Sequence, residues 1–133
     1  DWSSDVCSSD LQVLRDWLRL YCAGLEHEIF LVLYLDANHR LIEAQELFRG
    51  TLTQTSVYPR ELVKGALAHN AAAVILAHNH PSGSVLASPE DIDITKQLIK
   101  AGKIMGVCIV DHCIVSSEGI NSLRETESHL WGE

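Results

Sequence analysis

The sequence predicts an α/β domain in which a mixed β-sheet is flanked by helices. Short apolar runs rich in β-branched and aromatic residues recur along the chain, each too short for a helix. Segments with apolar side chains at helical spacing separate most of these runs. The chain has 133 residues, which is enough for one hydrophobic core and too few for two ordinary domains. The predicted order is helix, strand, strand, helix, strand, helix, strand, strand, which is typical of a single α/β sandwich.

The first half of the chain is predicted to contain two helices and a hairpin. Residues 12–22 have apolar side chains at helical spacing and predict an amphipathic helix. Residues 28–36 are apolar on both faces, as expected of an interior strand, and the turn DANH leads into a second strand, residues 40–48. An extended piece over 51–58 then precedes a helix over 59–70, which has a proline in its first turn.

The second half supplies the strand that leads into the candidate site. AAAVILA, residues 71–77, predicts a short buried strand, and the loop HNHPSG leaves its carboxyl end. Residues 88–102 predict a helix with acidic residues in the first turn, lysines in the last turn and Gly102 as its stop signal. Residues 106–117 predict a strand pair or one long bent strand, and residues 118–125 a turn followed by a short strand.

Residues 1–11, DWSSDVCSSDL, fit no periodic pattern and differ in composition from the rest of the chain. The string matches the translation of a common sequencing adapter, so we interpret it as a non-native segment and exclude it from reasoning about the fold. The predicted domain therefore covers residues 12–133, and we expect the natural protein to begin further upstream.

Composition argues against several classes of function. No apolar run approaches the ~20 residues of a membrane span, so we expect no membrane insertion. The formal net charge is -8 and the ten Lys and Arg residues are scattered singly, so we expect no direct nucleic-acid binding by this domain. The four cysteines form no CxxC pair and no secretory signal precedes them, which favours the reducing cytoplasm. Cys108 and Cys113 could meet as zinc ligands, but we interpret them as small buried hydrophobic residues.

Two histidines separated by one residue follow the buried strand. Side chains two apart share a face of an extended backbone, so His78 and His80 could chelate one ion at the end of this strand. Pro81 keeps His80 extended, because the residue before a proline is displaced from the helical region. Asp91, at the start of the next helix, could be brought back to them by the loop. Two imidazoles and one carboxylate are a ligand set of catalytic zinc sites, which leave one position open for water.

A structural interpretation competes for part of this pattern. Ser88 and Asp91 also form a capping box, with Ser88 as N-cap, Pro89 at the first helical position and an acid near the helix N-terminus. Capping explains these residues but not HNHP ten residues earlier. Single histidines are usually surface or core residues, and we assign that role to the others, namely His27, His39, His69 and His129.

The order His78-x-His80, seven residues, Ser88, two residues, Asp91 resembles the JAMM motif of the MPN-type zinc metalloproteases. More narrowly, the chain resembles the RadC family of bacterial and prophage proteins in EHEIFLVLYLDANHRLIEAQELFRGT, VYPRELVKGALAHNAAAVILAHNHPSG and VDHCIV. The resemblance covers residues 12–126. It implies the cytidine-deaminase-like architecture of JAMM domains, a bound Zn²⁺ and hydrolysis of a peptide or isopeptide bond.

The resemblance also implies a role for each matching residue. His78, His80 and Asp91 would hold zinc, while Ser88 would hydrogen-bond the developing oxyanion. The family pattern further requires a glutamate on an early strand, and Glu28 falls at that position. It would accept a proton from the metal-activated water and pass it to the leaving amine. On spacing alone three other glutamates compete for this role: Glu26, Glu43 and Glu46.

Three further polar residues accompany the motif. Asn79 points away from its histidine neighbours and is expected to tie the loop down. Asp111 and His112, in VDH, have two interpretations: they orient a ligand imidazole, or they form a polar strand terminus.

Three functions remain open at this point. The first is a zinc-dependent hydrolase that acts on a protein or peptide substrate. The second is a catalytically idle MPN scaffold that binds a partner through its sheet edges. The third is a DNA-repair-associated protein of the RadC family. The presence of all four motif residues together favours the first, and the sequence does not indicate an oligomeric state.

Overall fold

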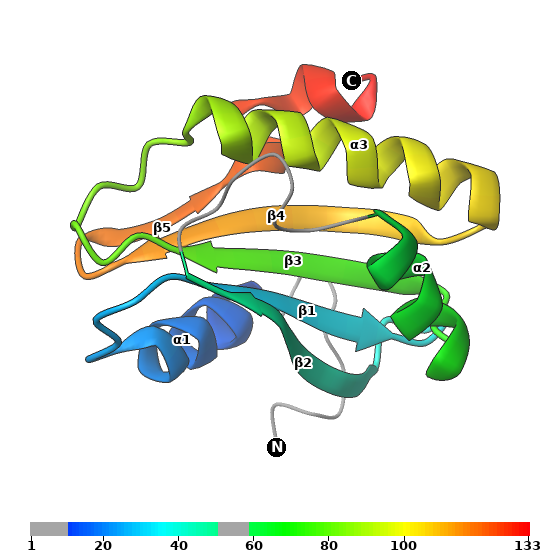
Figure 1. Ribbon diagram of the computed structural model, residues 1–133, viewed down its shortest axis with the longest axis horizontal. Coiled ribbons are helices and arrows are strands. Elements are labelled where there is room, and N and C mark those ends of the chain that lie inside the picture. The colour runs from blue at the N-terminus through cyan, green and yellow to red at the C-terminus, as the bar shows by residue number, and fades with distance from the viewer. Residues whose placement is uncertain (1–10, 51–58) are drawn as a thin grey trace.

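A computed structural model describes residues 11–50 and 59–133, and its elements follow the predicted order. The extended piece predicted over 51–58 and residues 1–10 lie outside the described residues. The predicted α/β class is confirmed, because a five-stranded mixed sheet is flanked by helices (Figure 1). The elements are α1 (Leu11–Cys22), β1 (Ile29–Leu35), β2 (Leu41–Arg49), α2 (Pro59–Ala68), β3 (Ala73–Asn79), α3 (Pro89–Met105), β4 (Cys108–Ser116), β5 (Gly119–Ser122), α4 (Leu123–Thr126) and the 3₁₀ helix η2 (Ser128–Trp131).

The strands are arranged in the order β2-β1-β3-β4-β5. β1 pairs antiparallel with both β2 and β3, β3 pairs parallel with β4, and β4 pairs antiparallel with β5. Every residue of β1 and of β3 is buried, as predicted for interior strands. The register places His78 of β3 beside Phe30 of β1, and Leu76 of β3 beside His112 of β4. The central strand therefore carries the first motif histidine inside the sheet.

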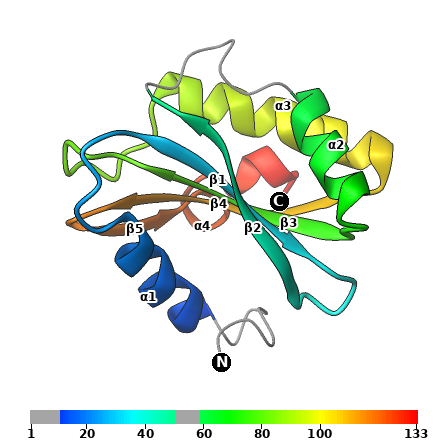
Figure 2. The same cartoon turned by 60° about the horizontal axis from the view of Figure 1, so that its bottom comes forward.

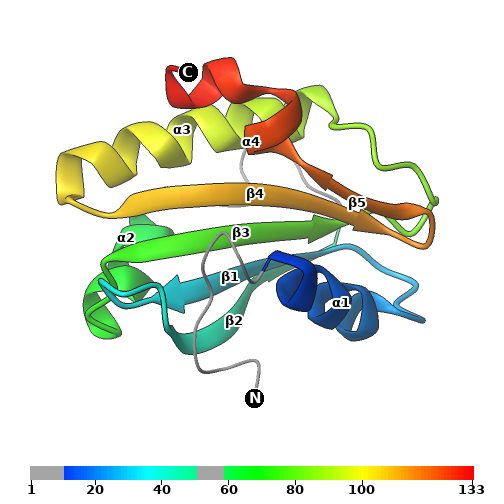
Figure 3. The same cartoon turned by 180° about the vertical axis from the view of Figure 1, so that it is seen from behind.

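Helices cover both faces of the sheet, so the domain has three layers (Figure 2). α2 and α3 pack on one face, over a core that includes Phe30 and Leu98. α1 covers the other face, where Leu14 and Leu18 pack against Leu31. Seen from behind, α4 follows β5 near the end of the chain (Figure 3), and η2 contacts both α4 and α3. No helix within 11–50 and 59–133 is long and apolar enough to cross a bilayer.

The prediction that Gly102 ends the third helix is wrong. α3 continues to Met105, and Gly106 ends it with a φ of 74°, the left-handed conformation that glycine adopts without steric cost. Gly102 lies inside the helix, where an added Cβ would stand 2.4 Å from the carbonyl oxygen of Val107. The missing side chain therefore allows the chain to turn back closely toward β4.

The bounds of β3 also differ from the sequence prediction. β3 begins and ends two residues later than predicted, at Ala73–Asn79, so His78 belongs to the strand rather than to the loop after it. Residues 106–117 contain a single long strand, β4, which is one of the two alternatives predicted for this segment. The two short C-terminal helices were not predicted. Ser122 caps α4 through the amide of Glu125, and the indole Nε1 of Trp131 donates to the carbonyl oxygen of Ile109 at 2.7 Å.

Candidate metal centre

The end of β3 positions both motif histidines. Successive strand side chains alternate between faces, so His78 follows Leu76 onto the face covered by α3. His80 lies one residue beyond the strand, and its backbone amide donates to the carbonyl oxygen of Val115 at 2.8 Å, which keeps it alongside β4. The side chain of His78 is 2% exposed and that of His80 is 12% exposed, so both imidazoles are largely removed from water.

The N-terminus of α3 positions Asp91. The Oγ of Ser88 accepts a hydrogen bond from the amide of Asp91 at 3.0 Å. In return, Oδ2 of Asp91 accepts from the amide of Ser88 at 2.8 Å and from its hydroxyl at 2.9 Å. The capping box and the site are therefore not exclusive alternatives, since the same reciprocal bonds that begin the helix also orient the carboxylate.

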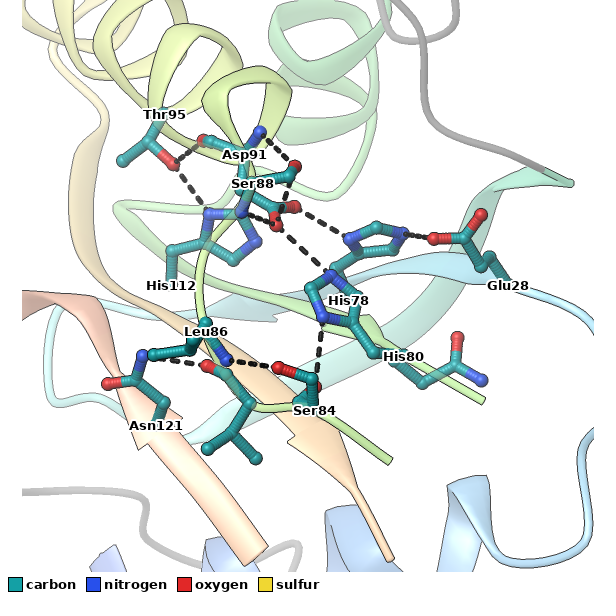
Figure 4. A network of polar contacts seen from close by, with 12 residues as sticks. Glu28, His78, His80, Ser84, Leu86, Ser88, Asp91, Thr95, His112 and Asn121 are labelled. Atoms are coloured by element: carbon teal, nitrogen blue, oxygen red, sulfur yellow. Dashed lines mark hydrogen bonds and ion pairs between the residues drawn. The ribbon is translucent and has the colours of Figure 1, made fainter. Parts of the chain in front are cut away.

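The carboxylate of Asp91 lies between the two imidazoles (Figure 4). Oδ1 is 2.7 Å from Nδ1 of His78, and Oδ2 is 3.1 Å from Nε2 of His80. Burial by itself raises the pKa of Asp91, but hydrogen bonds from both histidines and from Ser88 outweigh it and hold this pKa well below its usual range. Asp91 is therefore a buried carboxylate that stays charged because its neighbours donate to it.

His80 is surrounded by hydrogen-bond acceptors. Its Nε2 faces Asp91, and its Nδ1 is 3.0 Å from the carbonyl oxygen of Ser84. Two acceptors favour a proton on both ring nitrogens, and the hydrogen bond to Asp91 is the main cause of a raised pKa for His80. A metal ion needs an unprotonated ring nitrogen, so binding at His80 must displace a proton.

Glu28 immediately precedes β1 and approaches His78 from the side opposite Asp91. Its Oε1 is 3.3 Å from Nε2 of His78, and its side chain is 24% exposed. That Nε2 is buried and makes no hydrogen bond to any residue that the structure describes. Ligating atoms of Glu28, His78 and His80 all lie within 4.8 Å of one another, a spacing that fits one metal ion. The orphaned nitrogen and the nature of these donors agree with a metal centre.

Asn79 fixes the backbone on both sides of Glu28. Its Oδ1 accepts from the amide of Ile29 at 2.6 Å, and its Nδ2 donates to the carbonyl oxygen of His27 at 3.1 Å. The prediction was that this side chain fixes the histidine loop. Instead it fixes the backbone where β1 begins, and this keeps Glu28 close to His78.

The competing glutamates are placed differently. Glu26 lines the same cavity as Glu28, whereas Glu43 is exposed on β2 and Glu46 pairs with Arg49 at 2.9 Å.

The cavity at the centre has a volume of about 650 Å³ and is lined, among the described residues, by Glu26, His27, Glu28, Gly50, His78, His80, Pro81, Ser82, Ser88 and Glu90. His27, assigned to the surface or to structure from the sequence, therefore borders the candidate site.

Asp111 and His112 lie within β4 rather than at a strand end, and their roles differ from one another. Asp111 accepts hydrogen bonds from the hydroxyl of Ser122 at 2.5 Å and from the amide of Arg124, which joins β4 to α4. No described contact joins either residue to a motif imidazole. His112 contacts Thr95 instead, a residue that the sequence analysis did not single out.

The two cysteines weighed as zinc ligands do not meet at this centre. Cys108 is exposed at the start of β4, and Cys113 is buried on the α1 face with its Sγ 3.8 Å from Oδ2 of Asp111. Burial raises the pKa of the Cys113 thiol well above its usual value. The interpretation as a small buried residue agrees with the environment of Cys113, but it is wrong for Cys108, which is exposed.

Comparison with known proteins identifies the family. The family profile described as "RadC-like JAB domain" matches residues 8–128. The chain belongs to the RadC-like JAB domain family. A UPF0758 protein of Aromatoleum aromaticum is 60% identical over 114 residues, which are 86% of this chain and 50% of that protein. One from Dechloromonas aromatica is 59% identical over 103 residues, 77% of this chain and 46% of that protein. One from Thiobacillus denitrificans is 50% identical over 128 residues, 96% of this chain and 56% of that protein.

This RadC-like chain thus spans about half the length of the curated relatives it matches. Membership confirms the resemblance inferred from the motif and from the flanking segments. The names of these relatives state neither a reaction nor a metal.

Proposed function

We propose that this RadC-like domain is a zinc-dependent hydrolase that cleaves a peptide or isopeptide bond in a protein or peptide substrate. The observation that carries the proposal is that two imidazoles and one partly exposed glutamate converge on a single cavity, while the buried carboxylate of Asp91 contacts both imidazoles. A scaffold that binds through its sheet edges has no need for this convergence.

His78, His80 and Asp91 would hold the metal. Two imidazole nitrogens and a carboxylate oxygen form a donor set that zinc prefers. Zinc bound there would act as a Lewis acid and would lower the pKa of a bound water to about 7. On distance alone Glu28 is the favoured third ligand, because the ligating atoms that lie within 4.8 Å of one another belong to Glu28, His78 and His80 and not to Asp91. We assign the proton transfer to Glu28 because its side chain is more exposed than that of Asp91.

Glu28 would move the proton. Its carboxylate faces the cavity from the entry of β1 and is held there through Asn79. A carboxylate in this place can accept a proton from the attacking water and deliver it to the leaving amine. The neutral amine produced in this way is a far better leaving group than an amide anion.

Ser88 would stabilise charge on the substrate carbonyl oxygen. Its hydroxyl donates to Oδ2 of Asp91, while its backbone amide donates to the same oxygen. The hydroxyl group can therefore rotate toward a substrate while the hydrogen bond from the backbone amide of Ser88 to Asp91 stays in place. One such donor is worth on the order of 3 kcal/mol in the transition state.

Metal content tests the ligand assignment. The wild-type chain and three variants, His80→Ala, Asp91→Asn and Glu28→Gln, are loaded with zinc, freed of excess metal and measured by elemental mass spectrometry. We expect about one zinc per chain in the wild type and in E28Q, and a loss of at least tenfold in affinity in the other two. Equal zinc in wild type and H80A would overturn the metal centre. Loss of zinc in E28Q would make Glu28 a ligand.

A second measurement separates an enzyme from a scaffold. Zinc-loaded wild type and E28Q are incubated with a proteome-derived peptide library, and new termini are identified by mass spectrometry. New amino termini in the wild-type sample that are missing from the E28Q sample would support hydrolysis. Identical samples, with zinc bound in both, would favour the scaffold.

The cytoplasmic location favoured by cysteine usage remains a prediction.

A further inference from the structure

His112 is a buried polar residue that the proposed mechanism does not use. It lies in the middle of β4, its side chain is fully buried, and its ring is inclined by 64° to that of Phe30 with the ring centroids 5.6 Å apart. Its Nδ1 is 2.6 Å from the hydroxyl oxygen of Thr95 on α3, and its Nε2 is buried without a hydrogen-bond partner within 11–50 and 59–133. A core position of this kind is normally apolar, so the imidazole requires an explanation.

The hydrogen atoms available at Thr95 determine the tautomer of His112. The Thr95 hydroxyl oxygen is 2.6 Å from two atoms, the carbonyl oxygen of Asp91 and Nδ1 of His112. The carbonyl oxygen can only accept, so the single hydroxyl hydrogen lies between the two oxygens. The second short contact then needs a hydrogen from the imidazole. His112 is therefore the Nδ1–H tautomer, and its Nε2 carries a lone pair.

The resulting chain of hydrogen bonds runs from the sheet to the helix start (Figure 4). His112 donates to Thr95, and Thr95 donates to the backbone of Asp91, the residue whose carboxylate lies between the two motif imidazoles. β3 and β4 pair in parallel, with His112 beside Leu76, two residues before His78. The same pair of strands thus carries the imidazoles and fixes the first turn of α3.

We propose that His112, as the Nδ1–H donor to Thr95, is a positioning residue that holds Asp91 in register with His78 and His80. The inference rests on the metal centre proposed above, and it applies whether Asp91 binds the metal or orients the two imidazoles. Partners of this type, which contact a ligand residue rather than the metal, commonly change metal affinity 10- to 100-fold when they are removed.

Replacing His112 with Asn or with Gln distinguishes a role in positioning Asp91 from a role in filling the core. The side-chain nitrogen of Asn can occupy the place of Nδ1 and donate to Thr95, whereas that of Gln falls near Nε2. Zinc affinity is measured by competition with a chromophoric chelator for His112→Asn, His112→Gln, Thr95→Ser and Thr95→Val. We expect H112N and T95S to stay within about threefold of wild type, and H112Q and T95V to bind zinc at least tenfold more weakly.

Measurements on the folded protein control for general damage. Thermal unfolding of the metal-free proteins should place H112N and H112Q close together, so that a difference in zinc affinity reflects the donor position. Nitrogen-15 shifts of the metal-free wild type should show a protonated Nδ1 and an unprotonated Nε2 on His112.

The contrary outcomes are distinct. Equal zinc affinity for H112N and H112Q, or a protonated Nε2 in the wild type, would overturn the positioning role and leave the metal centre intact. A wild-type chain that binds no zinc would overturn the proposed function, and this inference with it.

Discussion

Burial keeps the imidazole of His112 neutral and lowers its pKa from 6.5 to about 3. In the unfolded chain the same group titrates near 6.5, so at acidic pH the unfolded state binds the proton more tightly than the folded state does. The stability that depends on a neutral His112 is therefore fully present above pH 6.5 and is lost as the pH falls from 6.5 toward 3. Within this window each pH unit lowers the free energy of unfolding by about 1.4 kcal/mol.

Urea unfolding of the metal-free protein checks this expectation. Wild type and His112→Asn, which has no titrating group at this position, are compared at pH 7.5 and pH 4.5. The wild type should lose roughly 2 to 3 kcal/mol more than H112N between the two conditions. The other titrating groups of the site, Asp91 and His80, are present in both proteins, so their contributions cancel in the difference. Equal losses would show that the fold does not hold His112 neutral.

At the scale of the elements, Gly102 joins α3 to β4. In an exposed helix, replacing glycine with alanine usually stabilises the protein by up to 1 kcal/mol, because the unfolded chain becomes less flexible. Here the new Cβ would lie 2.4 Å from the carbonyl oxygen of Val107, a backbone atom that cannot swing aside. We expect Gly102→Ala to lower the free energy of unfolding by about 1 to 3 kcal/mol, the usual cost of overpacking.

A matched change on the same helix isolates the steric cause. Lys100 is exposed on α3, two residues before Gly102. Lys100→Ala should change the free energy of unfolding by less than about 0.5 kcal/mol, as surface substitutions generally do. Chemical denaturation of both variants gives the comparison. A G102A protein as stable as wild type would show that the approach of β4 to this helix is looser than described.

Gly102 also shows where sequence patterns reach their limit. A glycine late in a helical pattern can end the helix in the left-handed conformation, or it can admit a close neighbour inside the helix. Both glycines of the pair Gly102 and Gly106 satisfy the local pattern, and only the packing of β4 separates their roles. The order of the elements along the chain followed from periodicity, whereas α4 and η2 are too short to give a periodic signal.

The contacts of the candidate site likewise fall into those that the sequence predicts and those that it does not. The strand period predicted that His78 and His80 share a face, and the capping box predicted the contact of Ser88 with Asp91. The approach of Asp91 to the histidines depends on the path of the loop between them and was implied by the family resemblance. The link from His112 through Thr95 joins residues 17 positions apart in sequence. It depends on the parallel register of β3 with β4 and on the depth at which α3 packs. Neither the strand register nor the packing depth of α3 can be predicted from the spacing of residues in the sequence.

At the scale of the whole molecule, the net negative charge disfavours polyanionic partners. The chain has 18 acidic and 10 basic residues, and the described lining of the cavity at the candidate centre includes three glutamates and no Lys or Arg. Negative potential at a cavity attracts cationic groups and repels polyanions. This distribution agrees better with a protein or peptide substrate than with a nucleic-acid backbone.

We therefore expect this chain to bind duplex DNA more weakly than the roughly 10⁻⁴ to 10⁻⁶ M that is typical of non-specific binding proteins. A gel-shift titration with a random 20-base-pair duplex, at 50 mM and 200 mM salt, measures this directly. A retarded complex at micromolar protein whose affinity falls steeply with salt would reveal phosphate contacts and favour the DNA-repair function. Such contacts would have to come from basic residues that the sequence scatters singly, each of which releases about one counterion at most. Several would then have to converge on one face, so charge-reversal variants of those residues would be the next measurement.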